Sequence, residues 1–266
     1  MKIQIITLIV LFSIVICTGI EQKSKQENHA QWSVVKNGSE LKIAYGSETA
    51  FPQYATLQLK DSYFRLVNSP SSGWGTSVIL LPVFWTNGTY YQGAPVDATW
   101  SISGPDLVLS IMGTIDNLNV SSEVRITPPE NNSISAHVRN EIEGSTPLDL
   151  RQAEAFKPIM LSSMHTSSSV WDTQGAFVDS QNYSIPVSGW IITPSASVRA
   201  NTFGLLGGTS NWKQKAPTIT IALDKPMQIA GWVTQSSNPN DDNVGYWAAS
   251  DNITHSYKYT IIAVSS

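Results

Sequence analysis

A stretch rich in carboxylates, amides and aromatic rings covers residues 236–252, SSNPNDDNVGYWAASDN. Carboxylate and amide oxygens are the ligands that Ca²⁺ takes in proteins, so the run predicts a loose calcium site on Asn240, Asp241 and Asp242. The run is not an EF-hand, because Asn243 and Ala249 stand where that loop requires a glycine and a bidentate glutamate. The alternative is turn chemistry, in which Asn and Asp side chains bond to their own backbone.

A second candidate for chemistry is the segment 148–172, which contains Glu154 and His165. If the segment is a strand, Glu154 shares a face with Leu150 and Phe156, and such neighbours raise the pKa of a carboxyl group. A carboxyl prepared in this way is the acid of a glycosidase or the base of a polysaccharide lyase, with His165 assisting proton transfer. The alternatives are a buried glutamate paired with an arginine and a histidine on a loop surface.

Other catalytic signatures are missing from the sequence. No second carboxylate stands at a spacing that is diagnostic of a glycoside hydrolase. Neither a G-x-S-x-G elbow nor an H-E-x-x-H pair occurs, so nothing supports a serine hydrolase or a zincin. The sequence therefore leaves catalysis uncertain.

Aromatic residues in loop-like contexts are the main binding candidates. Flat rings stack on the apolar faces of sugars, while amides and carboxylates bond to the hydroxyl groups. The predicted ligand-binding residues are Trp74, Trp85, Trp171, Asp172, Trp212, Tyr246 and Trp247. Trp100, Trp190 and Trp232 lie in strand-like contexts instead, and we expect them to pack in the core.

Composition and charge restrict the partners. Only 14% of residues are charged, against about 25% in a typical soluble protein, and nine residues are tryptophan. The formal net charge is −4 and the basic residues are scattered, so no basic face exists for a phosphate backbone. We expect carbohydrate or polysaccharide as the partner and no nucleic acid.

The N-terminal residues 1–20 predict a secretory signal peptide or an N-terminal membrane anchor, because Lys2 precedes an apolar run. Residues 21–30 are polar and predict a tether. Cys17 would be the lipidated residue of a bacterial lipoprotein, although Ile16 departs from the small residue of that pattern; the alternative is a plain hydrophobic cysteine. Membrane contact is expected only through this segment, with an extracellular or cell-surface location.

The mature part of the chain contains no cysteine, so a large apolar core must hold the fold. Six N-x-[ST] sequons suit an exported glycoprotein, and they predict glycosylation at Asn37, Asn87, Asn119, Asn131, Asn182 and Asn252.

Short β-type runs separated by Gly, Pro, Asn and Ser clusters follow one another from residue 31 onward. Gly104 and Pro105 predict a tight hairpin between two of them. The clearest runs are residues 40–45, 54–60, 96–103, 107–112, 217–223 and 255–264. Their spacing predicts an all-β fold, an antiparallel β-sandwich or its larger supersandwich variant, as a single domain over residues 31–266.

A central hairpin, residues 121–144, shows the clearest alternation. One face carries Val124, Ile126, Ile134, Ala136, Val138 and Ile142, and the other carries Glu123, Arg125, Ser135, His137, Arg139 and Glu141. With residues 128–132 as the loop, Glu123 would lie opposite His137. The polar face is either a solvated ladder of opposite charges or one wall of a polar cleft.

The run VRITPPENNSISAHVRNEIEGSTPLDL, residues 124–150, resembles the middle of galactose-mutarotase-like β-supersandwiches. The resemblance covers about 27 of 266 residues and implies a concave sheet that binds saccharides. Where an epimerase of this class has a histidine before proline, this chain has AFKP, residues 155–158. The resemblance therefore implies architecture and ligand class, and not epimerase chemistry.

These features predict an exported β-sandwich that binds carbohydrate through loop aromatics and Asn or Asp side chains. One alternative is a polysaccharide-active hydrolase or lyase that uses Glu154. The other is a structural or adhesive cell-envelope protein, which would expose an apolar patch and self-associate.

Overall fold

The computed structural model describes 18 strands and the tight turns between some of them. Within that part of the chain every element is a strand, a turn or a bend, which confirms the predicted all-β class. For residues 55–58, 63–66, 76–79, 83–86, 89–92, 155–164 and 243–250 it describes the backbone. The described residues are 31–46, 55–58, 63–66, 76–81, 83–86, 89–92, 94–115, 118–130, 133–143, 155–164, 173–183, 199–207, 218–234, 243–250 and 256–264.

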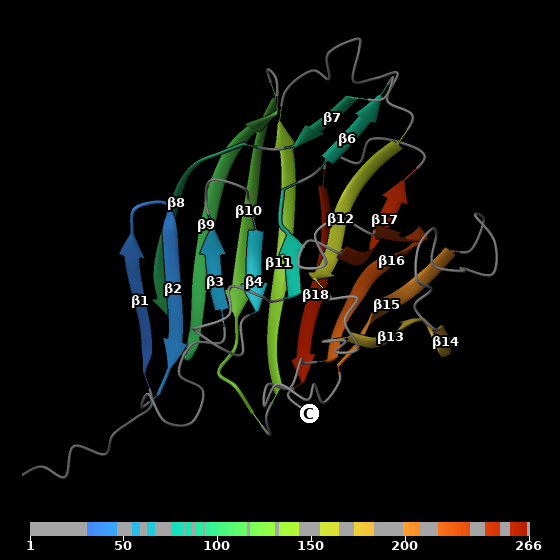
Figure 1. The fold of residues 1–266 in the computed structure, drawn as a ribbon. Helices are drawn as coiled ribbons and strands as arrows, with labels where there is room; N and C mark the ends of the chain where they lie inside the picture. The colour runs from blue at the N-terminus through green and yellow to red at the C-terminus, as the bar shows by residue number, and fades with distance from the viewer. Residues whose placement is uncertain are drawn as a thin grey trace, which may run out of the picture.

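The strands form two facing layers (Figure 1). The front layer runs, in order of pairing, through β1 (Trp32–Asn37), β2 (Glu40–Tyr45), β3 (Ala55–Gln58), β4 (Tyr63–Leu66), β5 (Thr76–Ile79), β12 (Ala155–Met164) and β17 (Asn243–Ser250). The back layer runs through β8 (Ala94–Ser103), β9 (Asp106–Ile115), β10 (Leu118–Ile126), β11 (Ser133–Glu143) and β18 (Ser256–Val264). All neighbours pair antiparallel, so the predicted antiparallel sandwich is confirmed.

One long strand, β16 (Thr218–Thr234), joins the two layers. Its first residues, up to Leu223, pair with β18 of the back layer, and its last residues, from Gln228, pair with β17 of the front layer. On its other side it pairs with β15 (Arg199–Gly207), which continues into β13 (Thr173–Val178) and β14 (Gln181–Tyr183). A two-stranded ribbon of β6 (Val83–Thr86) and β7 (Thr89–Gln92) extends from the first residues of β12.

The predicted run 217–223 is too short, because the strand continues through Pro226. Proline lacks the N–H that a sheet ladder requires, and it normally ends a central strand. Here residues 224–226 have no ladder partner, because β16 changes from β18 to β17 at this point and the register with β15 shifts as well. The other predicted runs all overlap a strand.

Two tight hairpins use glycine where the backbone needs a positive φ. Gly104 has a φ of +62° in the turn that joins Ser103 to Asp106, which confirms the predicted hairpin between β8 and β9. Gly38 has a φ of +59° in the turn between β1 and β2. These short turns fix the register of their strands.

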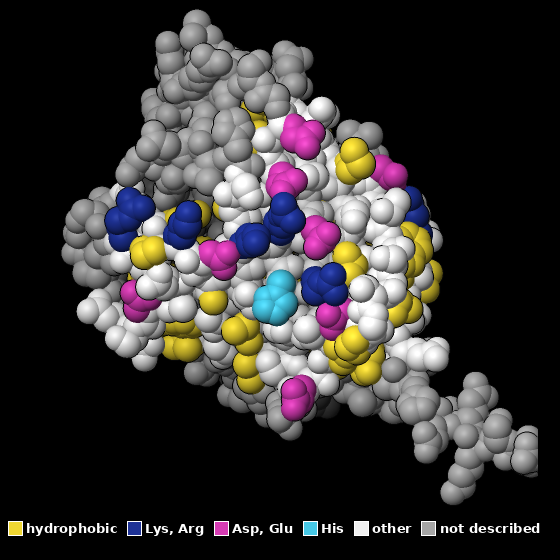
Figure 2. Space-filling model, turned by 180° about the vertical axis from the view of Figure 1, so that it is seen from behind, with side chains coloured by type: hydrophobic (Ala, Val, Ile, Leu, Met, Phe, Trp, Pro, Cys, Tyr) yellow, Lys and Arg dark blue, Asp and Glu magenta, His cyan; other side chains and the backbone are white. Residues whose placement is uncertain are grey.

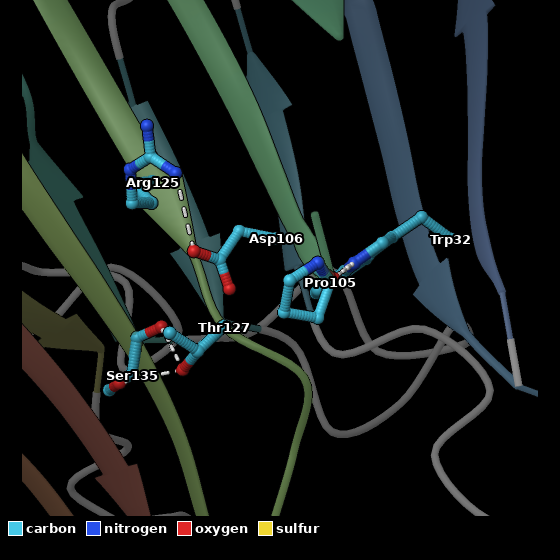
Figure 3. A network of polar contacts seen from close by, with 6 residues as sticks. All are labelled: Trp32, Pro105, Asp106, Arg125, Thr127 and Ser135. Carbon is cyan, nitrogen blue, oxygen red and sulfur yellow. Dashed lines mark hydrogen bonds and ion pairs between the residues drawn. The ribbon is translucent and has the colours of Figure 1, made fainter. Parts of the chain in front are cut away.

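The core lies between the layers and follows the alternation of the strands. The inward face of β10 and β11 carries Val124, Ile126, Ile134, Ala136, Val138 and Ile142, all of which are buried as predicted. Leu41 and Ile43 of β2 belong to the same core. At the edge where the sandwich is open, Trp32 Nε1 of β1 donates to the Pro105 carbonyl oxygen at 2.7 Å, which ties β1 to the turn of the back layer (Figure 3).

Candidate functional site

Strand β12 brings two groups of predicted aromatic residues into one region of the sheet. Trp85 of β6 lies opposite Ala155, near the start of β12, and opposite Tyr90 of β7. Trp247 of β17 lies opposite Met160 of the same strand. We call the strands β6, β7, β12 and β17 the aromatic sheet region. Strand rise and spacing put the backbone positions of Trp85 and Trp247 roughly 20 Å apart.

The aromatic sheet region therefore unites residues that are about 160 positions apart in the sequence. Tyr246 lies next to Trp247, opposite Leu161 of β12. The other predicted ligand residues, Trp74, Trp171, Asp172 and Trp212, lie outside the described residues. So do Asn240, Asp241 and Asp242 of the predicted calcium site. Elsewhere, no group of three or more His, Cys, Asp or Glu side chains is placed to hold a metal ion in the part of the chain that the structure describes.

The predicted catalytic residues Glu154 and His165 also lie outside the described residues. Their described neighbours in the sequence are Ala155 and Met164, the two ends of β12. A ten-residue strand separates its ends by about 30 Å. The assignment of Glu154 and His165 to one catalytic centre stays a prediction.

The outer face of the back layer carries a polar ladder, as the alternation of the central hairpin predicts. We define this polar ladder as Glu123, Arg125, His137, Arg139, Glu141, Lys258 and Thr260. Figure 2 shows this face, with basic and acidic side chains interspersed around a histidine. Opposite charges are mixed, so this face has no single sign that would attract a strongly charged polymer.

The register of the ladder differs from the prediction by two residues. Glu123 lies opposite Arg139, and Arg125 lies opposite His137. The predicted pairing of Glu123 with His137 is wrong because the turn is centred closer to Ser133, where Glu130 and Ser133 form a bridge. A shift of two residues equals the side-chain period of a strand, so the prediction of which residues share a face holds.

Hydrogen bonds organise the ladder around two ion pairs. Arg125 Nη1 lies 3.3 Å from Asp106 Oδ2 (Figure 3), and Arg139 Nη2 donates to Glu141 Oε1. His137 Nδ1 and Thr260 Oγ1 share a hydrogen bond of 2.9 Å. Exposed pairs of this kind contribute about 0–1 kcal/mol each. The ladder offers donors and acceptors to a polar ligand, but no described aromatic ring belongs to it.

A row of polar side chains on the inward face of the back layer was not predicted. Ser122, Asn140 and Tyr257 lie opposite one another on β10, β11 and β18, and Tyr259 follows on the same face. All four are buried. The Asn140 Nδ2 group donates to the Leu80 carbonyl oxygen at 2.8 Å, and Leu80 lies between β5 and β6. We call these four residues the buried polar row.

The two tyrosines of the buried polar row are uncharged over a wide pH range. Burial raises the pKa of the Tyr257 and Tyr259 phenols well above their ordinary value of 10.0, and the neighbouring Tyr259 raises that of Tyr257 further. The amide of Asn140 opposes this shift of the pKa on both phenols. The two rings stack with their centroids 6.5 Å apart.

The prediction that Trp100 packs in the core is wrong. Its exposed fraction is 40%, and Ile102 on the same strand is 62% exposed. The reason is the place of β8 at the edge of the back layer, where it pairs only with β9 among the described strands. Trp232 belongs to β16, and Trp190 lies outside the described residues.

Three of the six predicted glycosylation sites lie on described residues. Asn37, Asn119 and Asn182 are exposed, as a glycan acceptor must be. Asn87, Asn131 and Asn252 lie outside the described residues. The described part of the chain contains no helix with the length and hydropathy to span a membrane.

Comparison with known proteins finds likeness in structure but not in sequence. No protein-family model matches the sequence, and no curated protein matches it at a significant level. The fold is similar to part of the 4-alpha-glucanotransferase from Thermococcus litoralis, with a TM-score of 0.46 and 11% sequence identity. The match covers 89% of this chain and 40% of that enzyme. A likeness at this level carries no argument about the activity of this chain.

Proposed function

We propose that this protein is an exported, surface-exposed β-sandwich that binds carbohydrate through the aromatic sheet region. The observation that carries the proposal is the pairing of β12 with both β6 and β17, which places Trp85, Tyr246 and Trp247 in one stretch of sheet. Aromatic rings stack on sugar rings, and such contacts bind without net charge. This agrees with a chain in which only 14% of residues are charged.

The spacing of these positions indicates the size of the ligand. Backbone positions roughly 20 Å apart on one sheet suit an extended oligosaccharide better than a single sugar. The resemblance of residues 124–150 to galactose-mutarotase-like supersandwiches supports the same ligand class. Export rests on the apolar N-terminal run and on the exposed sequon residues.

Replacing either tryptophan should weaken glycan binding. We expect Trp85→Ala and Trp247→Ala each to reduce retention on the best-bound glycan about tenfold, because each removes one stacking platform. Retention is measured on a glycan array and then by titration with the best ligand. The matched control is Trp100→Ala, which deletes a partly exposed indole on β8.

The outcome is decided by comparing the three variants. Loss of retention in the β6 and β17 variants, with Trp100→Ala unchanged and all three folded by circular dichroism, supports the aromatic sheet region. Equal retention in all three on every recognised glycan would remove this region from carbohydrate binding.

A second candidate function, adhesion through self-association, is favoured by the open edge of the sandwich. Val35 on β1 is 55% exposed, and Trp100 and Ile102 on β8 are exposed as well. Asp97 is the only charged residue of the ten in β8. A long edge strand with apolar side chains and little charge can pair with the same strand of another copy.

Ile102→Lys is expected to reduce this self-association, because a charge on an edge strand opposes pairing. Sedimentation velocity over a concentration series measures the weight-average mass. The control is Met112→Lys, which places the same charge at a 63% exposed position of β9, a strand paired on both sides. A wild-type chain that stays monomeric over the whole series would exclude the adhesive function through this edge.

A further inference from the structure

The buried polar row contains hydrogen-bonding atoms that the protein does not satisfy. Ser122, Asn140 and Tyr259 have exposed fractions of 1%, 0% and 1%. Within the part of the chain that the structure describes, Ser122 Oγ, Asn140 Oδ1 and the Tyr259 hydroxyl have no hydrogen-bond partner. Buried polar atoms in folded proteins are nearly always bonded to protein or to ordered water.

These three groups lie close together on one face. Ser122 lies directly opposite Asn140, and Tyr259 lies opposite Val138, the next inward position of β11. Side chains opposite each other have Cβ atoms about 5 Å apart, and diagonal neighbours are about 7–8 Å apart. Asn140 is therefore within the reach of one small bridging molecule on either side, toward Ser122 of β10 and toward Tyr259 of β18.

The chemistry of the groups identifies that molecule. The buried polar row consists of two kinds of uncharged group, hydroxyls and an amide, and burial keeps the pKa of its phenols too high for a phenolate near neutral pH. The row has no carboxylate to balance the charge of a metal cation and no basic side chain to balance that of an anion. A buried water typically makes about three hydrogen bonds, and this cluster offers that number.

We propose that the back layer holds an internal water site, in which ordered water bridges Ser122 Oγ, Asn140 Oδ1 and the Tyr259 hydroxyl. The amide nitrogen of Asn140 is already bonded to the Leu80 carbonyl oxygen, so its oxygen is free to accept from this water. The water therefore extends a link that runs from β10 and β18, through Asn140, to the segment between β5 and β6. The proposal does not depend on carbohydrate binding.

The link has a structural role that follows from the position of Leu80. Its carbonyl group belongs to the connection that leads from β5 into β6, the strand that carries Trp85. Asn140 is thus a positioning residue for the start of the β6–β7 ribbon. Water that donates to the amide oxygen of Asn140 keeps the side chain oriented with its Nδ2 group toward the Leu80 carbonyl oxygen.

Deleting one hydroxyl tests the proposal, because the change in stability has opposite signs with and without the water. Removing a hydroxyl that is bonded to water loses a hydrogen bond, whereas removing an unsatisfied buried hydroxyl relieves a penalty. We expect Tyr259→Phe and Ser122→Ala each to lower the thermal midpoint of the full chain by about 2–4 °C. Because both act on water that is bonded to Asn140 Oδ1, the double variant should lose less than the sum of the two single losses.

The controls delete the same atoms outside the buried polar row. Tyr45→Phe removes a hydroxyl from a half-buried ring, and Ser110→Ala removes one from the outer face of β9, so both should leave the midpoint nearly unchanged. Midpoints of Tyr259→Phe and Ser122→Ala that rise, or that do not change, would overturn the proposal. A crystal structure of the wild-type chain at better than about 2 Å gives the direct test. Density for water within hydrogen-bond distance of at least two of the three atoms supports the site, and its absence overturns it.

Discussion

Gly204→Ala is expected to lower the free energy of unfolding by more than about 3 kcal/mol, a large part of the stability of a domain. Gly204 lies on β15 between Phe177 of β13 and Thr220 of β16. A Cβ atom at this position would lie 2.0 Å from the Ile219 carbonyl oxygen and 2.6 Å from the Phe177 ring. Relief requires a shift of the β16 backbone, because a carbonyl group cannot rotate away as a side chain can. Urea unfolding followed by tryptophan fluorescence measures the loss.

A second glycine separates this contact from the general cost of replacing glycine. A Cβ atom on Gly104 meets nothing within 4 Å, although its φ of +62° disfavours other residues. We expect Gly104→Ala to cost only about 1 kcal/mol. Equal losses of unfolding free energy in Gly204→Ala and Gly104→Ala would mean that the close approach of β15 and β16 does not determine the cost of a side chain at position 204.

Alkaline pH is expected to unfold the protein through the buried polar row. The pKa of Tyr257 and of Tyr259 is raised in the folded state, so these phenols keep their protons when the unfolded chain releases them. Their contribution to stability is therefore complete below pH 10 and is lost as the pH rises above it. A phenol that keeps its proton in the folded state lowers the stability by about 1.4 kcal/mol for each pH unit above 10, so the loss grows steadily as the solution becomes more alkaline.

The measurement is a pH titration in which the absorbance of tyrosinate and the circular dichroism signal are both followed through the unfolding transition. Ionisation of the two buried phenols should coincide with loss of the circular dichroism signal of the sheet, whereas exposed tyrosines ionise earlier. In the double variant with Tyr257→Phe and Tyr259→Phe, the dependence of stability on pH above 10 should be shallower. A double variant with the slope of the wild type would show that other groups control alkaline unfolding.

Sequence patterns identified the faces of the strands better than their partners. The alternation of Val124 and Ile126 with Arg125 shows which side is buried, because that property depends on neighbours along one strand. The partner of Glu123 depends on where the turn closes. The bridge between Glu130 and Ser133 sets that position, and the pairing differs from the predicted one by two residues. The passage of β16 through Pro226 depends on an exchange of neighbouring strands that no local pattern contains.

In the candidate sites, too, the properties of a single strand were predictable from the sequence, whereas the contacts between strands were not. Asn140 occupies an inward position between Val138 and Ile142, so its burial was visible in the alternation. Its bond to Leu80, sixty residues earlier, depends on the facing layer and could not be predicted from the alternation. The exposure of Trp100 likewise follows from the position of β8 at an edge. The sequence contexts of Trp85 and Trp247 each predict a ligand-binding residue. Only the pairing of β12 shows that the two residues share a sheet.

The change of partners along β16 has a mechanical consequence. Both layers, and the arm formed by β15, β13 and β14, are hydrogen-bonded to this one strand. A shearing force that slides one layer over the other must break the ladders of β16 on both of its halves at once. Fraying that begins at β1 or β8 has to cross several strands before it arrives there. Tension applied at β1 would therefore separate the strands of that edge while the ladders of β16 stayed intact.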